Sequence, residues 1–371
     1  MRKKKNSMKT IALWFDKTPD CELEEKKEID IHINFWKVLN KSKKVLKKQE
    51  YFIDFGFMIE DAKSIEKLHL HFPSKVEQSD FEDLGKMIGK DVKYVNAIFN
   101  ENYEMISDST HPKHRTIKDK AQKTIFVIYS IDIKSDDILL SDCYGGTKVS
   151  IKIPASTAQE NHKIYIRIRL KGNAVKYFIR EYTPKNWFFQ SAFTSIDAID
   201  FRINEKRNCN DSLAEKITEE QLFNINKIHF LVMRDAQDDL IANNLRITCR
   251  ELEVDLWQEY VGKEYGVENI IAYHWSEKAS EVPNESRKFL DSFNAWVKIK
   301  YHKSNFKTII LYILIIGIMS ISFNILSTCI TNYIFNGNKQ KDKTSIQKKM
   351  DNNLSDTQYN TNKPYPDIKS E

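Results

Sequence analysis

Eight basic side chains gather in one short stretch of the chain, Thr147–Arg180, which contains a single acidic residue, Glu160. The whole chain of 371 residues has a formal net charge of only +6, so the excess of positive charge is concentrated in this stretch. Within it, two runs of alternating apolar and polar residues flank Gly172 and Asn173, a pair typical of a two-residue hairpin turn. The spacing therefore predicts a β-hairpin over residues 163–180.

The register of this hairpin gathers cationic and aromatic side chains on one face of the sheet. Arg169 then lies opposite Lys176, a like-charge pair that a sheet normally avoids. A face of this kind is typical of a site for an anionic partner such as a nucleotide, a nucleic acid strand or a phospholipid head group. A solvated, lysine-rich strand face is the competing interpretation. The candidate ligand-binding residues are Lys163, Tyr165, Arg167, Arg169, Lys171, Lys176, Phe178 and Arg180.

Patterns that indicate catalysis or metal binding are weaker. Asp235 and Asp238 follow the apolar run Ile228–Met233, where the carboxylates of hydrolases and nucleases often lie. His111 and His114 have a spacing found in metal sites, but no Cys, His or carboxylate nearby completes such a site. We therefore expect no metal, no cofactor and no catalytic centre. A membrane-tethered hydrolase or nuclease that uses Asp235 and Asp238 is the alternative.

A long apolar segment lies near the C-terminal end of the sequence. Residues Thr308–Phe335 are 28 consecutive residues without a charge. As a helix this segment is about 42 Å long, which exceeds the roughly 30 Å of a bilayer's hydrocarbon core. The segment therefore predicts a single transmembrane helix, and the lipid bilayer is the first partner that we expect.

The orientation of this helix is not set by its flanks, because lysines stand on both sides of it in similar number. Near the N-terminus, the apolar run Ile11–Phe15 is shorter than the roughly 7–15 residues of a signal peptide core. We therefore expect a single-pass protein of the inner or plasma membrane, with its N-terminal domain in the cytoplasm.

Small and polar residues of the transmembrane segment fall within an arc of about 100° around the expected helix. Membrane helices approach one another along such surfaces, and an Asn in mid-membrane requires a hydrogen-bonding partner. The pattern predicts a homo-oligomer that forms through this helix. The residues of this small-residue stripe are Gly317, Ser320, Asn324, Ser327, Thr328 and Thr331.

The rest of the chain has the period-two alternation of β-strands, as in Ile29–Phe35, Val149–Ile153 and Ile199–Ile203. About ten such runs with few helical segments, and without a βαβ rhythm, predict a mainly β fold of the antiparallel sandwich or barrel type. Only 10 glycines occur, which counts against folds that need glycine turns under phosphates. The five cysteines are far apart, as is usual for reduced thiols in the cytosol.

Changes in composition predict six regions. They are an N-terminal β-rich lobe at residues 1–106, a basic linker loop at 107–122, a second β-rich lobe at 123–283, a juxtamembrane amphipathic helix at 284–307, the transmembrane helix at 308–335 and a disordered polar tail at 336–371.

In its layout the chain resembles the membrane-anchored effectors of bacterial anti-phage signalling systems, which join a cytosolic sensor to membrane helices. The resemblance implies a β-rich sensor domain that binds an anionic ligand and acts through a self-associating membrane helix. The alternatives are the tethered hydrolase or nuclease and a passive scaffold that holds a partner protein at the membrane.

Overall fold

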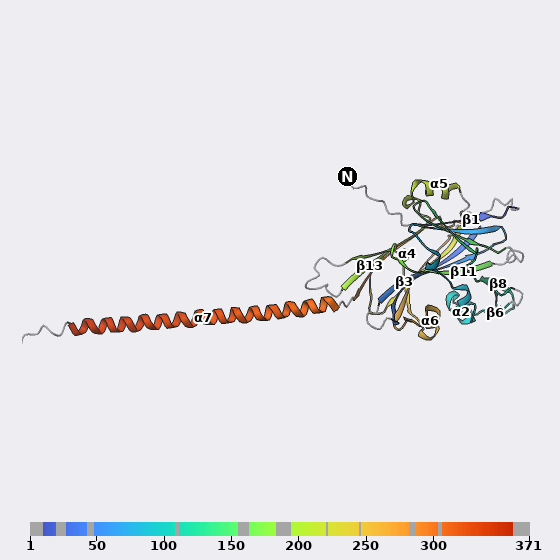
Figure 1. Ribbon diagram of the computed structural model, residues 1–371. Coiled ribbons are helices and arrows are strands. Elements are labelled where there is room, and N and C mark those ends of the chain that lie inside the picture. Colours follow the sequence, from blue (N-terminus) through green and yellow to red (C-terminus); the bar gives the residue numbers. More distant parts are fainter. Residues whose placement is uncertain are drawn as a thin grey trace, which may run out of the picture. The chain divides into compact units, whose positions relative to one another are not determined.

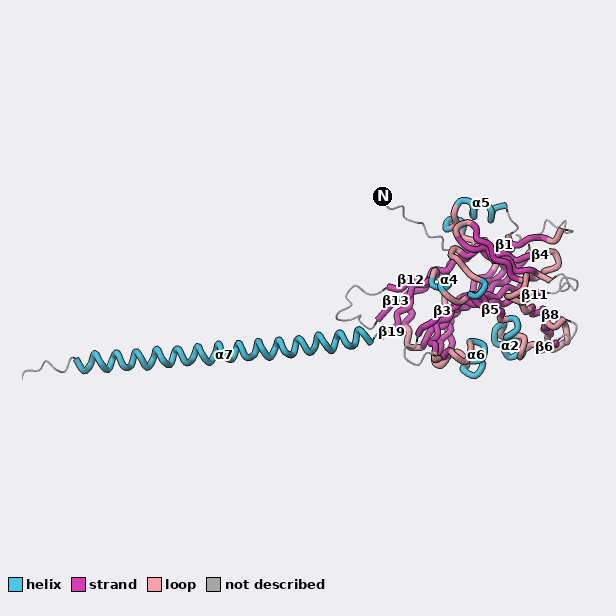
Figure 2. Tube along the Cα trace, in the orientation of Figure 1, coloured by secondary structure: helices cyan, strands magenta, loops and turns pink. Residues whose placement is uncertain are grey.

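The computed structural model describes residues 10–19, 27–42, 48–107, 111–154, 163–182, 194–219, 222–244, 246–281, 287–302 and 306–358. The chain divides into two units, residues 1–303 and residues 304–371. The first unit is built mainly of β-strands and the second is a helix (Figure 2).

The described strands of the first unit form two sheets, of eight and of eleven strands. The 8-stranded sheet has the order β15 (Asp239–Asn243), β19 (Phe293–His302), β13 (Thr194–Ile203), β1 (Thr10–Lys17), β4 (Ile65–Phe72), β10 (Gly146–Lys152) and β9 (Ile138–Cys143), with β12 (Ile179–Tyr182) paired to β13. The 11-stranded sheet has the order β16 (Thr248–Glu251), β18 (Ile270–Lys278), β14 (Asn224–Asp235), β2 (Glu28–Asn40), β3 (Lys48–Ile59), β11 (Lys163–Leu170), β8 (Thr124–Tyr129), β7 (His114–Lys118) and β6 (Glu104–Ser107), with β17 (Tyr265–Gly266) on β2 and β5 (Phe81–Asp83) on β11.

The two sheets pack on one another through the apolar faces that the alternation predicts. Ile29, Ile31 and Ile33 of β2 point into the core between the sheets and are fully buried. Their neighbours His32 and Asn34 point to the opposite face of the 11-stranded sheet, because successive side chains of a strand alternate. The prediction of a mainly β sandwich is therefore confirmed. Most pairs are antiparallel, but β1 with β13, β2 with β14 and β8 with β11 are parallel, so both sheets are mixed.

Short helices cover the outer faces of both sheets (Figure 1). Helix α5 (Asp211–Glu219) packs through Leu213 and Ile217 on the 8-stranded sheet. Helices α1 (Gly85–Ile88), α2 (Val92–Phe99) and α6 (Val254–Val261) cover part of the 11-stranded sheet, where they enclose a second apolar core. This second core surrounds the candidate site.

The two lobes predicted at residues 1–106 and 123–283 are not separate. Strands from both regions alternate in each sheet, since β2 pairs with β14 and β1 pairs with β13. The predicted linker at 107–122 contains β7, which joins β6 to β8 within the 11-stranded sheet. Pairing between distant strands, which local composition does not report, makes one unit of these regions.

The juxtamembrane helix predicted at residues 284–307 is also wrong where the structure describes it. Residues 293–302 form β19, whose side chains alternate between buried and exposed along the strand. Phe293, Val297 and Tyr301, which are spaced like one face of a helix, also share one face of a strand because they are an even number of residues apart.

The second unit is helix α7 (Phe306–Gln358). Its segment Ile309–Phe335 is long and apolar enough to cross a membrane, and none of it is buried within the protein. The helix continues to Gln358 through most of the segment predicted to be a disordered tail. Residues 359–371 of that segment lie outside the described residues.

Candidate ligand-binding cavity

The hairpin predicted at residues 163–180 does not form. After β11 the chain makes a turn at Gly172, which has a positive φ of 84°, and enters the single helical turn α4 (Asn173–Lys176). It then continues as β12, which pairs with β13 in the other sheet. The turn buries Val175 and Phe178 in the core between the sheets, and this burial carries the chain from one sheet to the other.

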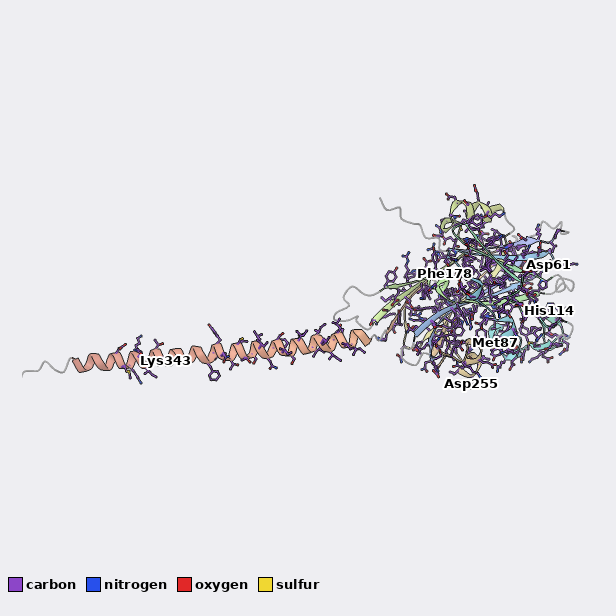
Figure 3. All side chains as sticks on the ribbon, in the orientation of Figure 1. Asp61, Met87, His114, Phe178, Asp255 and Lys343 are labelled. Atoms are coloured by element: carbon purple, nitrogen blue, oxygen red, sulfur yellow. The ribbon has the colours of Figure 1, made fainter. Side chains whose placement is uncertain are left out.

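The predicted ligand face is therefore divided. Lys176 and Arg180 are exposed, while Phe178, labelled in Figure 3, lies in the core. Lys163 and Lys171 form ion pairs with Glu60 and Glu82. Tyr165, Arg167 and Arg169 share one face of β11, as predicted, but this face is covered by the second apolar core and all three side chains are buried.

Arg169 has a complete set of partners in this buried position. Asp54 lies opposite it on β3, so Arg169 faces a carboxylate rather than Lys176. Its Nε donates to Asp54 Oδ1 over 2.6 Å and its Nη2 to Oδ2 over 3.2 Å. Trp36 Nε1 and the Tyr260 hydroxyl also donate to Oδ2. This bidentate ion pair is the arrangement that compensates a buried charge.

Arg167, two residues before Arg169, is buried without a carboxylate in direct contact; Asp54, which already pairs with Arg169, is linked to it only through the Tyr260 hydroxyl. Its Nε donates to the Tyr260 hydroxyl and its Nη1 to the Tyr165 hydroxyl, each over 2.7 Å. With the Asn34 amide oriented so that its oxygen faces Arg167, Nη2 donates to that oxygen over 2.7 Å. Among the described residues, none of these partners carries a charge. A cation in such a position is stabilised by solvent or by an anion.

Arg167 lines a cavity of about 600 Å³ on the outer face of the 11-stranded sheet. Its sheet-side lining comes from β2, β3, β8, β11, β14 and β18. It is bounded by residues 97–100 at the end of α2, by Trp257 of α6 and by β16. A volume of this size is in the range of small-molecule sites.

Rings lie side by side along this cavity. His32 on β2 and His229 on β14 are paired across the two strands, and their ring centroids are 4.9 Å apart. His274 on β18 lies beside His229, with centroids 5.1 Å apart and nearly parallel planes, and a 2.9 Å hydrogen bond joins His229 Nδ1 and His274 Nε2. Phe99 at the end of α2 contacts His32 at 5.3 Å. Phe99 also contacts Tyr103 at 6.4 Å. These five residues, Tyr103, Phe99, His32, His229 and His274, are called the ring row below.

The three histidines of the ring row are held in the neutral form. Burial, together with the nearby cations and the neighbouring histidines, lowers the pKa of His32 well below its usual value. Burial, Lys227 and His274 lower the pKa of His229 to about 3, and the pKa of His274 is lowered by burial and Lys227. Neutral imidazoles present flat faces and hydrogen-bonding nitrogens without adding charge.

Charged side chains complete the lining, with cations in excess. The described lining contains four cationic side chains, Lys163, Arg167, Lys227 and Arg250, and two carboxylates, Asp30 and Glu60. Glu60 is paired with Lys163 at 2.7 Å. Burial, followed by repulsion from Glu60, raises the pKa of Asp30. The cavity is therefore suited to a ligand with negative charge and an apolar or aromatic part.

Local sequence features position the residues at the end of α2. The Asp91 side chain caps the first turn by accepting from the Lys93 N–H over 2.9 Å. Asn100 ends the helix in the left-handed conformation, with φ of 54°. On the sheet, Gly56 of β3 leaves room for the Tyr165 ring, whose hydroxyl lies 3.1 Å from His32 Nδ1.

The carboxylates of the alternative enzyme hypothesis have structural partners. Asp238 lies 3.0 Å from Arg234, which also pairs with Asp197 inside the sandwich at 2.8 Å. Asp235 accepts from the Gln237 N–H in the turn after β14. Over the described residues, no group of three or more His, Cys, Asp or Glu side chains is arranged to hold a metal ion.

A second arrangement resembles catalytic machinery. His69 Nδ1 lies 2.8 Å from the Ser150 hydroxyl and His69 Nε2 lies 2.8 Å from Asp16 Oδ2, so the two ring nitrogens are exchanged relative to a serine hydrolase triad. Ser150 is also only 7% exposed, faces its neighbours across adjacent strands and does not line the cavity. We assign this group a structural role in the 8-stranded sheet.

On α7, three hydroxyls bond back to their own helix: Ser322 to the Ile318 carbonyl, Thr328 to that of Asn324 and Thr331 to that of Ser327. Two of them, Thr328 and Thr331, belong to the predicted small-residue stripe, together with Gly317, Ser320, Asn324 and Ser327. All six stripe residues are exposed on the single helix.

No protein-family model matches the chain, and no curated protein matches its sequence.

Proposed function

We propose that this chain is a membrane-anchored binding protein whose β-rich unit takes up an anionic ligand in the cavity beside α2 and α6. The observation that carries the proposal is Arg167, a fully buried guanidinium that lines the cavity and whose direct hydrogen-bond partners are all neutral. A buried charge of this kind is costly unless a counter-charge is present. The excess of cationic over acidic side chains in the lining supports the same conclusion.

The proposed site lies on the cytoplasmic side of the membrane. The uncharged segment Ile309–Phe335 anchors the chain as a single span. The four cysteines in the described part of the chain, Cys143, Cys209, Cys249 and Cys329, are free, which supports a reducing compartment.

The proposed response to the ligand is self-association of α7 along the small-residue stripe. A sensor joined to a membrane helix is also the layout of membrane-anchored anti-phage effectors, and a role in defence rests on that layout alone.

The proposal is tested by a thermal-shift screen of the full-length protein in detergent. The panel contains inorganic phosphate, pyrophosphate, dicarboxylates, sugar phosphates and nucleotides. We expect at least one of these anions to raise the Tm of the wild-type protein and of Arg180→Met, which removes an exposed cation outside the cavity. Arg167→Met should lose the response. The proposal is wrong if no anion raises the Tm, or if Arg167→Met responds like the wild type.

A further inference from the structure

The ring row described above points to the class of anion that the cavity takes. The row crosses three strands that are direct neighbours in the sheet, β2, β14 and β18. Beyond β2 it continues to Phe99, which contacts Tyr165 of β11 and Phe126 of β8. From Phe99 to His274 the successive centroid distances are 5.3, 4.9 and 5.1 Å. The ring planes are tilted by 53° between Phe99 and His32 and by 85° between His32 and His229, whereas His229 and His274, at 15°, form one nearly flat surface.

The ring row differs from an ordinary aromatic core in what lies against it. All five rings line the 600 Å³ cavity, and four of them, Tyr103, Phe99, His229 and His274, are only partly buried. Part of each of these four side chains is therefore exposed beside the cavity. A packed core leaves few voids larger than a water molecule.

The cations of the lining lie beside these rings along the cavity. Arg167 shares its Tyr165 partner with the ring row, because the Tyr165 hydroxyl also lies 3.1 Å from His32. Lys227 is two residues from His229 on the same face of β14, and Arg250 comes from β16, the strand next to β18. Aromatic faces interleaved with cations are the arrangement by which proteins bind unpaired nucleotides, because bases stack on the rings while phosphates meet the cations.

We propose that the ligand is a nucleotide, whose base stacks on the ring row and whose phosphate lies at Arg167. This inference rests on the proposed function and makes it more specific. The volume limits the site to a small nucleotide rather than a continuous nucleic acid strand.

Calorimetric titration of the full-length protein in detergent tests this inference. The probes are the four ribonucleoside monophosphates and the corresponding dinucleotides, linear and cyclised. Ribose 5-phosphate, which carries the charge without the base, and a 20-nucleotide single strand serve as comparison ligands. We expect at least one mono- or dinucleotide to bind tenfold or more tightly than ribose 5-phosphate, because each stacked base contributes about that factor or more.

Two variants locate the base on the ring row. Phe99→Leu and His274→Leu remove a ring from different parts of the row, and each should weaken nucleotide binding about tenfold while leaving the affinity for ribose 5-phosphate unchanged. Tyr182→Leu, which removes an exposed ring outside the cavity, should have no effect. Because the two ring variants alter different elements, a folding defect in one leaves the other as a test.

The negative results that contradict the nucleotide inference differ from the one that contradicts the proposed anion site. If ribose 5-phosphate binds as tightly as every nucleotide, or if neither ring variant weakens nucleotide binding, the nucleotide inference is overturned while the anion site remains. Tighter binding of the 20-nucleotide strand than of every small nucleotide also overturns it, in favour of a nucleic acid partner. If no anion binds at all, both the inference and the proposed function are wrong.

Discussion

Arg167 and Arg169 are two residues apart on one strand, yet only Arg169 has a carboxylate in direct contact. Arg169 meets the Asp54 carboxylate in a bidentate pair, whereas Arg167 meets two phenol hydroxyls and an amide. Both guanidiniums are fully buried. Arg169 and Asp54 neutralise each other, whereas Arg167 is the cation to which the proposed function assigns an anionic ligand.

This difference predicts unequal effects on stability. Arg169→Met leaves Asp54 buried without its counter-charge and should lower the free energy of unfolding by about 3–5 kcal/mol. Arg167→Met removes a charge that has no carboxylate partner, so it should cost less than about 2 kcal/mol. Urea unfolding of both full-length variants in detergent measures the two values. Equal losses would show that Arg167 has a compensating partner after all.

The histidines of the ring row predict a pH dependence. The pKa of His229 is about 3 in the folded protein, and the ordinary value of an unfolded histidine is near 6.5. The neutral folded form is therefore fully favoured above pH 6.5, and its contribution is lost as the pH falls from 6.5 towards 3, because unfolding then takes up a proton.

Urea unfolding at pH 7.5 and at pH 5 measures this contribution. The wild type should lose more stability between these pH values than His229→Phe does, by about 1–2 kcal/mol. An equal loss in both proteins would contradict the lowered pKa of His229.

At the scale of elements, strand β3 has to leave space for the Tyr165 ring of the neighbouring strand β11. Gly56 lies between His32 on β2 and Arg167 on β11 in the register of the sheet. A Cβ atom at position 56 would lie 2.2 Å from the Tyr165 hydroxyl, which is too close for any contact. The Tyr165 ring therefore occupies the place of a side chain on β3.

Gly56→Ala should displace Tyr165 and with it a hydrogen-bond partner of Arg167. We expect a loss of about 1–3 kcal/mol in the free energy of unfolding, as for other overpacked positions, together with weaker anion binding. Gly266→Ala is a suitable comparison, because a Cβ there would meet the flexible end of the Lys41 side chain instead. Unchanged anion affinity in Gly56→Ala would argue against a role of Tyr165 in holding Arg167.

The strands themselves could be predicted where their alternation is regular. The alternation of β2 predicts which of its faces packs in the core. His32 and Asn34 are polar residues on the other face, which another layer of the fold covers, and buried polar residues of this kind indicate the candidate site. The burial of that face was not predictable, because the covering elements α2 and α6 are distant in sequence. The failed hairpin after Leu170 has the same cause, since β12 has its partner in the other sheet.

The histidines of the site could not be grouped from the sequence. His32, His229 and His274 are separated by up to 242 positions, and only the strand order β2, β14, β18 brings them together. By contrast, the basic residues of β11 are close in sequence, so Arg167 was predicted as a ligand residue, although on an exposed face rather than in a cavity.

At the scale of the whole molecule, the uncharged segment of α7 is long and apolar enough to cross a membrane, and it also contains the small-residue stripe. Asn324 lies within this segment, where a polar side chain without a partner is costly. A hydrogen bond to a second α7 helix would satisfy the Asn324 side chain and would stabilise the association of the two helices by roughly 0.6–2 kcal/mol.

Asn324→Leu should therefore weaken the oligomer several-fold, measured as the yield of crosslinked species in membranes. Ser322→Leu is the matched control, because Ser322 lies outside the stripe and its hydroxyl bonds to its own helix. Equal crosslinking of the wild type and both variants would show that the stripe has no role in assembly.

The most direct measurement of the central claim is an experimental structure of the full-length protein with the tightest-binding anion from the panel. We predict that the anion lies in the cavity, with an oxygen atom within hydrogen-bonding distance of the Arg167 guanidinium. An anion bound only at other positions, with the cavity unoccupied, would contradict the account.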